Sequence, residues 1–282
     1  MKKTLLLALT VLTLLSGCSK KEETKDKIRI GIMPDAGALP LLLMEEVETV
    51  PFLSAKERDA AMQLGELDGM MSDMVSVVMF NQKAIPMKVL TITESRFMIV
   101  GTPEFTEDKE WTVGLSENTV IEYMVDQWAG DRLIDKVSIP QVPVRMEMLG
   151  SGKIPLACLT DAMAWPLLSR GFGIVRDQQG SGLEPAVLVF SDKYLKEAGG
   201  KMEEFTRSWN KAVEKINRNP GDYRTLLQEQ VRLPEIEGFP YPVPEFRPVT
   251  LPTEEQVASV TDWYESRFGL TRPVSYEEMM IR

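Results

Sequence analysis

Two stretches of the sequence, residues 65–77 (GELDGMMSDMVSV) and residues 152–164 (GKIPLACLTDAMA), contain the same parts in nearly the same order. Each begins with a glycine suited to ending a helix, runs through a short apolar segment, and reaches a hydroxyl residue followed by aspartate. The second copy carries one extra residue before that pair. The repetition predicts two similar halves, each of which presents a strand end and a helix start to one shared cleft.

The N-terminal residues indicate export and anchoring. Lys2 and Lys3 precede an apolar run, residues 5–15, that is too short to span a bilayer as a helix. The run ends in Leu15-Ser16-Gly17-Cys18, which resembles the lipobox of bacterial lipoproteins. That resemblance implies a signal peptide over residues 1–17, lipid attachment to Cys18, and a location on the bacterial cell membrane facing the periplasm or cell exterior. The alternative is an ordinary secretory signal with a chance cysteine.

Charge and composition limit the kinds of molecule that the protein is expected to bind. Residues 18–27 are almost wholly polar after the cysteine and are predicted to form a flexible tether. The chain has a formal charge of −10, and loss of Lys2 and Lys3 with the signal would make it −12. An acidic body has no electrostatic footprint for nucleic acid, so no nucleic-acid partner is expected. We expect a monomer.

The cysteine and histidine content excludes several kinds of chemistry. The sequence contains no histidine, which excludes Ser-His-Asp catalysis, Cys-His catalysis and the common zinc sites. Cys158 lies in an apolar run and is interpreted as a buried, inert thiol. The methionines at 70, 71, 74 and 79 are interpreted as core filling rather than metal ligands. No metal, cofactor or catalytic residue is predicted.

Strand-like and helix-like segments alternate from Ile28 onward with short connections. This order favours an α/β fold with mainly parallel sheets flanked by helices. We predict two lobes joined by two hinge crossings: lobe I over residues 28–97 and 185–282, and lobe II over residues 98–184. Residues 186–190 are expected to return as a buried strand to lobe I. Thr253 and Gln256 form a capping-box pattern at the start of the last long helix.

The order of these features resembles the solute-binding lipoproteins of ABC importers with a periplasmic-binding-protein-like type II fold, in the branch for nitrate, sulfonates, taurine and thiamine pyrimidine precursors. The features that carry the resemblance are the lipobox, the opening strand at residues 28–32, Gly65–Gly69, residues 149–154, and the closing stretch from Leu251 to Glu278. The resemblance covers essentially the whole mature chain. It implies capture of a small polar organic molecule in the interlobe cleft and delivery to permease transmembrane subunits.

Four strand-to-helix junctions, two in each half, are predicted to line this cleft, because helix starts offer free N–H groups to a ligand. The candidate ligand-binding residues are Asp35, Ala36, Ser54, Ser72, Asp73, Ser95, Arg96, Ser116, Asn118, Thr119, Thr160, Asp161, Trp165 and Glu184.

Each candidate has a second interpretation. Ser72, Asp73, Thr160 and Asp161 are also suited to capping their own helices alone. An anionic ligand would use Arg96 and residues 116–119, and the excess of carboxylates over arginines slightly favours a cationic ligand instead.

Two other functions stay open at this point. One is an enzyme on the same fold that acts on a small carboxylated substrate, as a menaquinone-pathway dehydratase does. The other is an extracellular sensor or binding lipoprotein without an importer. We predict that the protein is not an enzyme, because the lipobox argues for an extracytoplasmic location.

Overall fold

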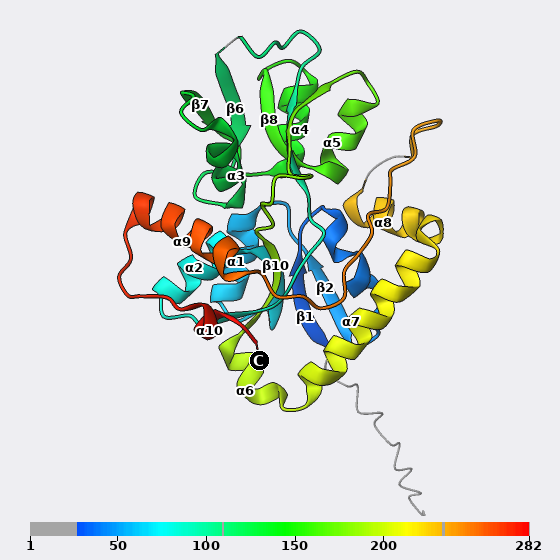
Figure 1. Ribbon diagram of the computed structural model, residues 1–282. Helices are drawn as coiled ribbons and strands as arrows, with labels where there is room; N and C mark the ends of the chain where they lie inside the picture. The colour runs from blue at the N-terminus through cyan, green and yellow to red at the C-terminus, as the bar shows by residue number, and fades with distance from the viewer. Residues whose placement is uncertain (1–26, 109, 233–234, 282) are drawn as a thin grey trace, which may run out of the picture.

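The computed structural model describes residues 27–108, 110–232 and 235–281. Two five-stranded sheets, each covered by helices, lie one above the other (Figure 1). The predicted signal peptide, lipidated cysteine and most of the tether lie outside the described residues. Among the helices that the structure describes, none has both the length and the apolar character needed to cross a bilayer.

We call the body built on the first sheet lobe I. Its strands are β1 (Ile28–Ile32), β2 (Val47–Pro51), β3 (Gly69–Asp73), β4 (Met87–Ile92) and β10 (Ala186–Ser191). The sheet order is β2-β1-β3-β10-β4. Its helices are η1 (Ala36–Leu43), α1 (Ala55–Gln63), α2 (Met74–Gln82), α6 (Asp192–Ala198), α7 (Lys201–Arg218), η2 (Pro220–Tyr223), α8 (Arg224–Val231), α9 (Glu254–Phe268) and α10 (Tyr276–Met279).

We call the body built on the second sheet lobe II. Its strands are β5 (Phe97–Gly101), β6 (Trp111–Leu115), β7 (Ile134–Ser138), β8 (Leu156–Thr160) and β9 (Gly173–Asp177), in the order β7-β6-β8-β5-β9. Its helices are α3 (Val120–Ala129), α4 (Val142–Gly150) and α5 (Asp161–Leu168). The two sheets therefore have the same arrangement, with β6, β7 and β8 in the places of β1, β2 and β3.

The chain crosses between the lobes through residues 93–96 and 178–185. The expectation that Phe97 belongs to lobe I is wrong, because this residue begins β5 of lobe II. Each crossing is followed by a strand that runs antiparallel to both of its neighbours. The first leads into β5, between β8 and β9, and the second leads into β10, between β3 and β4. The remaining pairs are parallel, so both sheets are mixed. A hydrogen bond from Thr93 N to Ala186 O (3.0 Å) ties the two crossings together. The predicted two-lobed α/β class and the return of residues 186–190 to lobe I are confirmed.

The repeat contains no inserted residue, so that part of the prediction is wrong. Gly65 and Gly152 both have positive φ angles, 73° and 71°, and each lies four residues before its strand. Both strands have five residues, and their last residues, Asp73 and Thr160, occupy the N-cap position of the next helix. Asp73 therefore matches Thr160, and Asp161 is the first residue of α5. Matching by residue type had paired Asp73 with Asp161 because both follow a hydroxyl residue.

Local sequence sets the form of several helices. Helix α4 begins at Val142, with Pro143 in its first turn, where a missing N–H costs nothing. The helix-like segment after β1 is a 3-10 helix that contains Pro40. The capping box of Thr253 and Gln256 is confirmed.

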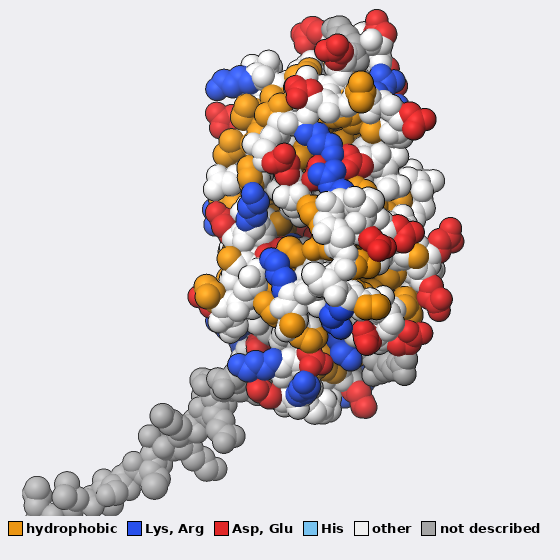
Figure 2. Space-filling view, turned by 90° about the vertical axis from the view of Figure 1, so that its left-hand side faces the viewer, with side chains coloured by type: hydrophobic (Ala, Val, Ile, Leu, Met, Phe, Trp, Pro, Cys, Tyr) orange, Lys and Arg blue, Asp and Glu red, His pale blue; other side chains and the backbone are white. Residues whose placement is uncertain are grey.

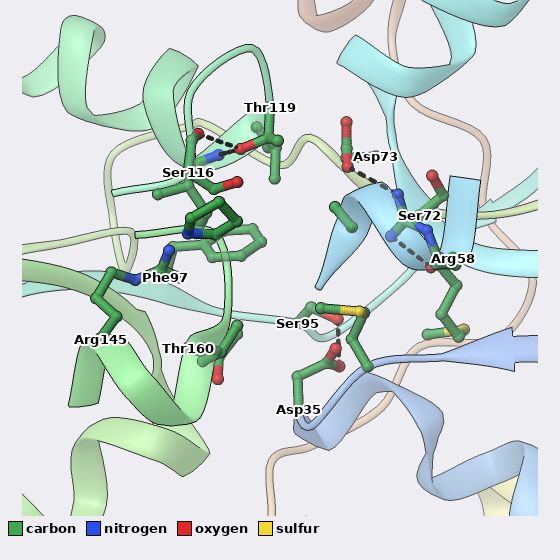
Figure 3. Close-up of a pocket in the computed structure, with 17 residues that line it drawn as sticks. Asp35, Arg58, Ser72, Asp73, Ser95, Phe97, Ser116, Thr119, Arg145 and Thr160 are labelled. Atoms are coloured by element: carbon green, nitrogen blue, oxygen red, sulfur yellow. Dashed lines mark hydrogen bonds and ion pairs between the residues drawn. The ribbon is translucent and has the colours of Figure 1, made fainter. Parts of the chain in front are cut away.

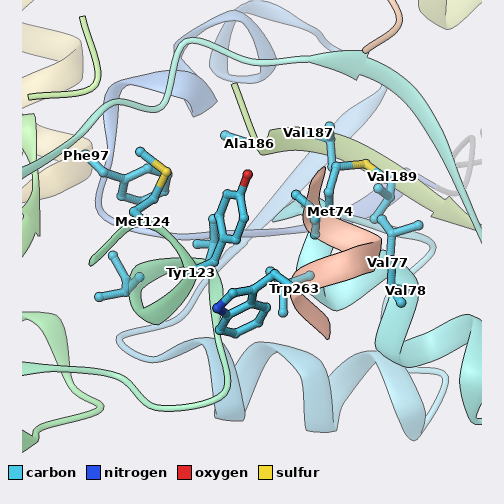
Figure 4. Close-up of a cluster of buried hydrophobic side chains, with 14 of the residues drawn as sticks. Met74, Val77, Val78, Phe97, Tyr123, Met124, Ala186, Val187, Val189 and Trp263 are labelled. Atoms are coloured by element: carbon cyan, nitrogen blue, oxygen red, sulfur yellow. The ribbon is translucent and has the colours of Figure 1, made fainter. Parts of the chain in front are cut away.

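The largest apolar cluster extends through both lobes (Figure 4). Met74 of α2 and Val187 of β10 pack in it from lobe I, and Tyr123 of α3 packs in it from lobe II. Trp263 of α9 lies against the Tyr123 ring at a centroid distance of 5.6 Å. Met74 and Met70 are fully buried in this cluster, which confirms the interpretation of these methionines as core filling.

Candidate functional site

A cavity of about 60 Å³ lies between the lobes, where the carboxyl ends of β1, β3, β6 and β8 meet helix starts. This volume is several times the roughly 10–15 Å³ that a cavity needs to hold one water molecule, so the cavity has room for more than a single water. The polar residues of its lining are Asp35, Arg58, Ser72, Asp73, Ser95, Ser116, Thr119, Arg145 and Thr160. Each is 8% exposed or less, so the polar lining is largely shielded from bulk solvent. Figure 3 shows the lobe I groups facing the lobe II groups across it.

Asp35 supplies a carboxylate to the lobe I wall. It caps η1 by accepting from Gly37 N (2.8 Å), and Ser95 Oγ donates to the same oxygen (2.6 Å). A Cβ atom at Gly37 would lie 2.4 Å from Ser95 Oγ, so this turn requires glycine. Burial raises the pKa of Asp35, because desolvation outweighs the two hydrogen bonds and the distant charge of Arg58.

Arg58, on α1, is a buried guanidinium in which each of the three nitrogens has a hydrogen-bond partner. Its Nε and Nη2 donate to Asp59 Oδ1 (2.9 and 2.7 Å), and Nη1 donates to Met71 O (2.9 Å). Asp73 Oδ2 lies 3.7 Å from Nη2, and Asp73 also caps α2 by accepting from Ser76 N (2.8 Å). Burial raises the pKa of Asp73, with Arg58 opposing that shift. Arg58 is therefore paired within this cluster, unlike the second buried arginine of the lining.

Arg145, on α4 of lobe II, is fully buried and has a different environment. Its Nη1 donates to Ile139 O (2.8 Å), but Nε and Nη2 have no hydrogen-bond partner among the described residues. Burial lowers the pKa of this guanidinium to about 10, and the one ionisable group that opposes the shift is the Cys158 thiol. The group nevertheless stays charged at neutral pH. A buried cation with two unused donors on a cavity wall attracts an anion strongly.

Two hydroxyl groups of the lining are also without partners. Ser72 Oγ on the lobe I wall and Ser116 Oγ on the lobe II wall are buried and make no hydrogen bond to the described residues. Other hydroxyls are engaged in the protein: Thr119 Oγ1 donates to Ser116 O (2.7 Å), and Thr160 Oγ1 donates to Pro34 O (3.0 Å) across the lobes. Buried polar groups normally have partners, so Ser72, Ser116 and Arg145 identify one polar site.

Arg58 and Arg145 are equivalent residues of the two halves. Each is the fourth residue of the helix that follows the second strand of its sheet, and each lies seven residues before the repeat glycine. The strand beneath each carries glycine, Gly31 or Gly114. A Cβ at Gly31 would lie 3.3 Å from Arg58 Cγ, and one at Gly114 would lie 3.5 Å from Arg145 Cγ. Neither arginine is among the predicted site residues, because both lie seven residues before the glycine at which the visible repeat begins.

Seven of the fourteen candidate residues line the cavity: Asp35, Ser72, Asp73, Ser95, Ser116, Thr119 and Thr160. Three others lie beside it without contributing to the lining. Ala36 is the first residue of η1, Ser54 caps α1 by accepting from Glu57 N (3.3 Å), and Asn118 has a positive φ of 61° in the turn before α3.

The remaining four candidates are engaged elsewhere. Arg96 Nε donates to Asp177 Oδ1 (2.8 Å). Glu184 is paired with Arg247 (2.7 Å). Asp161 accepts from Tyr241 Oη (2.7 Å), and Trp165 donates to Phe239 O (3.0 Å) and stacks on the Phe239 ring. These partners come from segments remote in sequence, so residue patterns near the candidates did not reveal them.

The fold resembles that of solved binding proteins. The structure matches the periplasmic aliphatic sulphonate binding protein SsuA from Escherichia coli with a TM-score of 0.70 and 13% identity, covering 90% of this chain and 97% of that one. It matches the ligand-binding component of an ABC-type import system from Staphylococcus aureus with a TM-score of 0.69 and 13% identity, covering 91% and 96%. For the periplasmic nitrate-binding protein NrtA from Synechocystis PCC 6803 the TM-score is 0.60 at 11% identity, covering 74% and 68%.

At these identities the similarity shows the fold: a two-lobed α/β binding-protein architecture. No family model and no curated protein matches the sequence.

Proposed function

We propose that this protein is the extracytoplasmic solute-binding component of an ABC importer, anchored to the membrane by a lipid on Cys18. It captures a small polar organic molecule in the interlobe cavity and delivers it to the permease subunits. The named activities of the matched structures, sulphonate binding, nitrate binding and ABC-type import, support this function. The cavity at the strand ends supports it independently.

The observation that carries the ligand class is Arg145. Arg145 lines the cavity, and two of its guanidinium nitrogens have no partner among the described residues. The described lining residues of lobe II include no carboxylate. We therefore infer an anionic group, a sulfonate or carboxylate, on the ligand. This inference replaces the slight preference for a purely cationic ligand, which was based on a set of candidate residues that lacked both buried arginines.

Isothermal calorimetry and thermal-shift measurements on the full chain in detergent test the proposal with small sulfonates, carboxylates and nitrate. Arg145→Met should weaken binding by about 2–5 kcal/mol, because the anion then enters a buried site without its counter-charge. Arg170→Met, at an exposed arginine of the same lobe, is the control and should bind as the wild type does. Equal binding by the Arg145→Met protein would contradict this role for Arg145.

Two further measurements separate the alternatives. Mass spectrometry of the recovered ligand should show it unchanged, whereas a chemically altered product would favour an enzyme on this fold. Cys18→Ser should release the protein from the membrane fraction of the cells that produce it. A protein that remained membrane-bound after this substitution would exclude the lipid anchor.

A further inference from the structure

The two walls of the cavity differ in charge although they are built from equivalent elements. Asp35 and Thr119 both cap the helix that follows the first strand of their lobe. Asp59 and Met146 both follow the equivalent arginines, and Asp73 and Thr160 both end the third strand. At each of these three places lobe I has a carboxylate and lobe II has a neutral side chain.

Because of these three differences, Arg58 has carboxylates beside it, whereas Arg145 has none among the described residues of the lining. Arg58 is neutralised by Asp59, which binds it through Nε and Nη2. Asp73 lies farther from Arg58, and Asp35 has hydrogen bonds from Ser95 and Gly37 but no ion pair among the described residues. The lobe I wall therefore carries excess negative charge when its carboxyl groups are ionised. The lobe II wall carries Arg145 and no carboxylate of the described lining.

Charges of opposite sign on opposing walls select a ligand with the reverse arrangement. A single anion would satisfy Arg145 and Ser116 but would bring its remaining atoms toward buried carboxylates at Asp35 and Asp73. A single cation would leave the buried Arg145 unpaired, which is costly. A molecule with an anionic group at one end and an ammonium group at the other avoids both of these unfavourable interactions.

We propose, building on the anion-binding function above, that the ligand is a small zwitterion. Its anionic group is bound by Arg145 and Ser116 of lobe II, and its cationic nitrogen is bound by Asp35 and Asp73 of lobe I, with Ser72 as a further acceptor. Because each end contacts a different lobe, such a ligand joins the lobes through its own two charges.

Matched pairs of small molecules test this directly. Each pair keeps the acid and exchanges the ammonium group for a methyl group of similar size: taurine against propanesulfonate, β-alanine against butyrate, and γ-aminobutyrate against pentanoate. Dissociation constants are measured by calorimetry on the full chain. The zwitterion of at least one pair should bind about tenfold or more tightly than its methyl analogue, because the buried carboxylates favour the ammonium group.

Asp35→Asn is the variant that identifies the cation subsite. Asparagine keeps an oxygen for Gly37 N and Ser95 Oγ, so the η1 cap is preserved while the charge is removed. This variant should lose most of the preference for the zwitterion and retain binding of the methyl analogue. Asp68→Asn, at a half-buried carboxylate just before β3 and at the opposite end of that strand from Asp73, is the control, and its preference should equal that of the wild type.

The outcomes separate this inference from the proposed function. Equal or tighter binding of the methyl analogues in every pair, with binding still dependent on Arg145, would overturn the zwitterion and leave an anion-binding protein. A preference for the zwitterion that survives Asp35→Asn unchanged would overturn the cation subsite at Asp35. No measurable binding of any acid would overturn both proposals.

Discussion

At the level of single residues, Arg58 and Arg145 show how surroundings determine what a buried charge does. Arg58 has two carboxylates within 4 Å, whereas Arg145 has two guanidinium nitrogens without partners among the described residues. A buried unsatisfied donor costs about 1–3 kcal/mol, and an unpaired charge costs more. Arg145 is therefore expected to lower the stability of the ligand-free protein, as binding groups often do.

Replacing each arginine by methionine should consequently change stability in opposite directions. Arg145→Met should raise the free energy of unfolding of the ligand-free protein by about 1 kcal/mol, since methionine packs like the arginine stem without burying a charge. Arg58→Met should lower it by about 3–5 kcal/mol, because Asp59 and Asp73 would be left buried without their cation. Urea denaturation of both variants measures this, and a destabilised Arg145→Met protein would indicate a structural role for Arg145.

Cys158 provides a second prediction about a single side chain. The thiol is fully buried on β8, and burial raises its pKa to about 12 although Arg145 lies near it. Because the thiolate is the reactive form, Cys158 should resist alkylation at neutral pH in the folded protein. A Cys18→Ser variant, in which Cys158 is the sole thiol, should react with iodoacetamide in urea and remain unlabelled in native buffer. Rapid labelling of the native protein would show that the interior of lobe II opens readily.

At the level of elements, local patterns predicted most strands and helices. The capping box of α9, the glycine before β3 and the alternating apolar residues of β1 act through neighbours within a few positions, so the sequence displays them. The antiparallel β5 and β10 depend on how the chain re-enters each sheet, which no local pattern encodes. The same holds for Arg145, because its importance comes from the lack of a carboxylate among the described lining residues on its own side of the cavity, whereas the opposite wall carries Asp35 and Asp73.

Helix α9 connects the lobes in a way that the sequence did not predict. It belongs to lobe I but lies beside α3 of lobe II (Figure 1). Trp263 Nε1 donates to Asp126 (3.0 Å), and Arg267 Nη2 lies 2.7 Å from Glu122, whose side chain is 1% exposed. Lys136 contacts both acids, so the four charged groups form one network across the lobe boundary. Figure 2 views the molecule from the left-hand side of Figure 1, where α9 and α3 lie, and shows Lys or Arg side chains next to Asp or Glu side chains on that face.

Removing one member of this network should weaken the protein more than removing an exposed ion pair. Arg267→Ala should cost about 1–2 kcal/mol, because Glu122 is buried and loses a charge-assisted hydrogen bond. Arg218→Ala is a matched control: it removes a pair on α7 in which both side chains are about two-thirds exposed, and it should cost less than about 0.5 kcal/mol. Equal losses in the two variants, measured by thermal denaturation, would mean that α9 does not hold the lobes together through these charges.

At the level of the whole molecule, the two lobes are held by contacts on several sides of the cavity. Thr160 bonds to Pro34 O, and Val142 N donates to Leu53 O (3.2 Å). Tyr241, from the loop between α8 and α9, reaches Asp161 of lobe II. Breaking such contacts would widen the cavity between the lobes, so opening by rotation about the two crossings is the expected motion.

Asp161 makes the contact between Tyr241 and lobe II dependent on pH. Burial raises its pKa from the ordinary 3.8 to about 6, while Tyr241 and Ala162 N oppose the shift and Asp35 adds to it. The folded protein binds this proton more tightly than the unfolded chain does. The protonated Asp161 therefore contributes to the free energy of unfolding, and this contribution is fully present below about pH 4. It is lost as the pH rises through about 6, at a cost of roughly 3 kcal/mol.

Asp161→Asn isolates this contribution from other carboxyl groups such as Asp35 and Asp73, whose pKa values are also raised. Asparagine keeps the shape and cannot ionise, so the variant should gain stability relative to the wild type as the pH increases from 4 to 7. Denaturation of both proteins at half-unit intervals of pH gives this difference directly. A difference that stays constant over the whole range would mean that Asp161 titrates as an ordinary carboxyl group, and that the contact between Tyr241 and α5 holds the lobes equally at every pH.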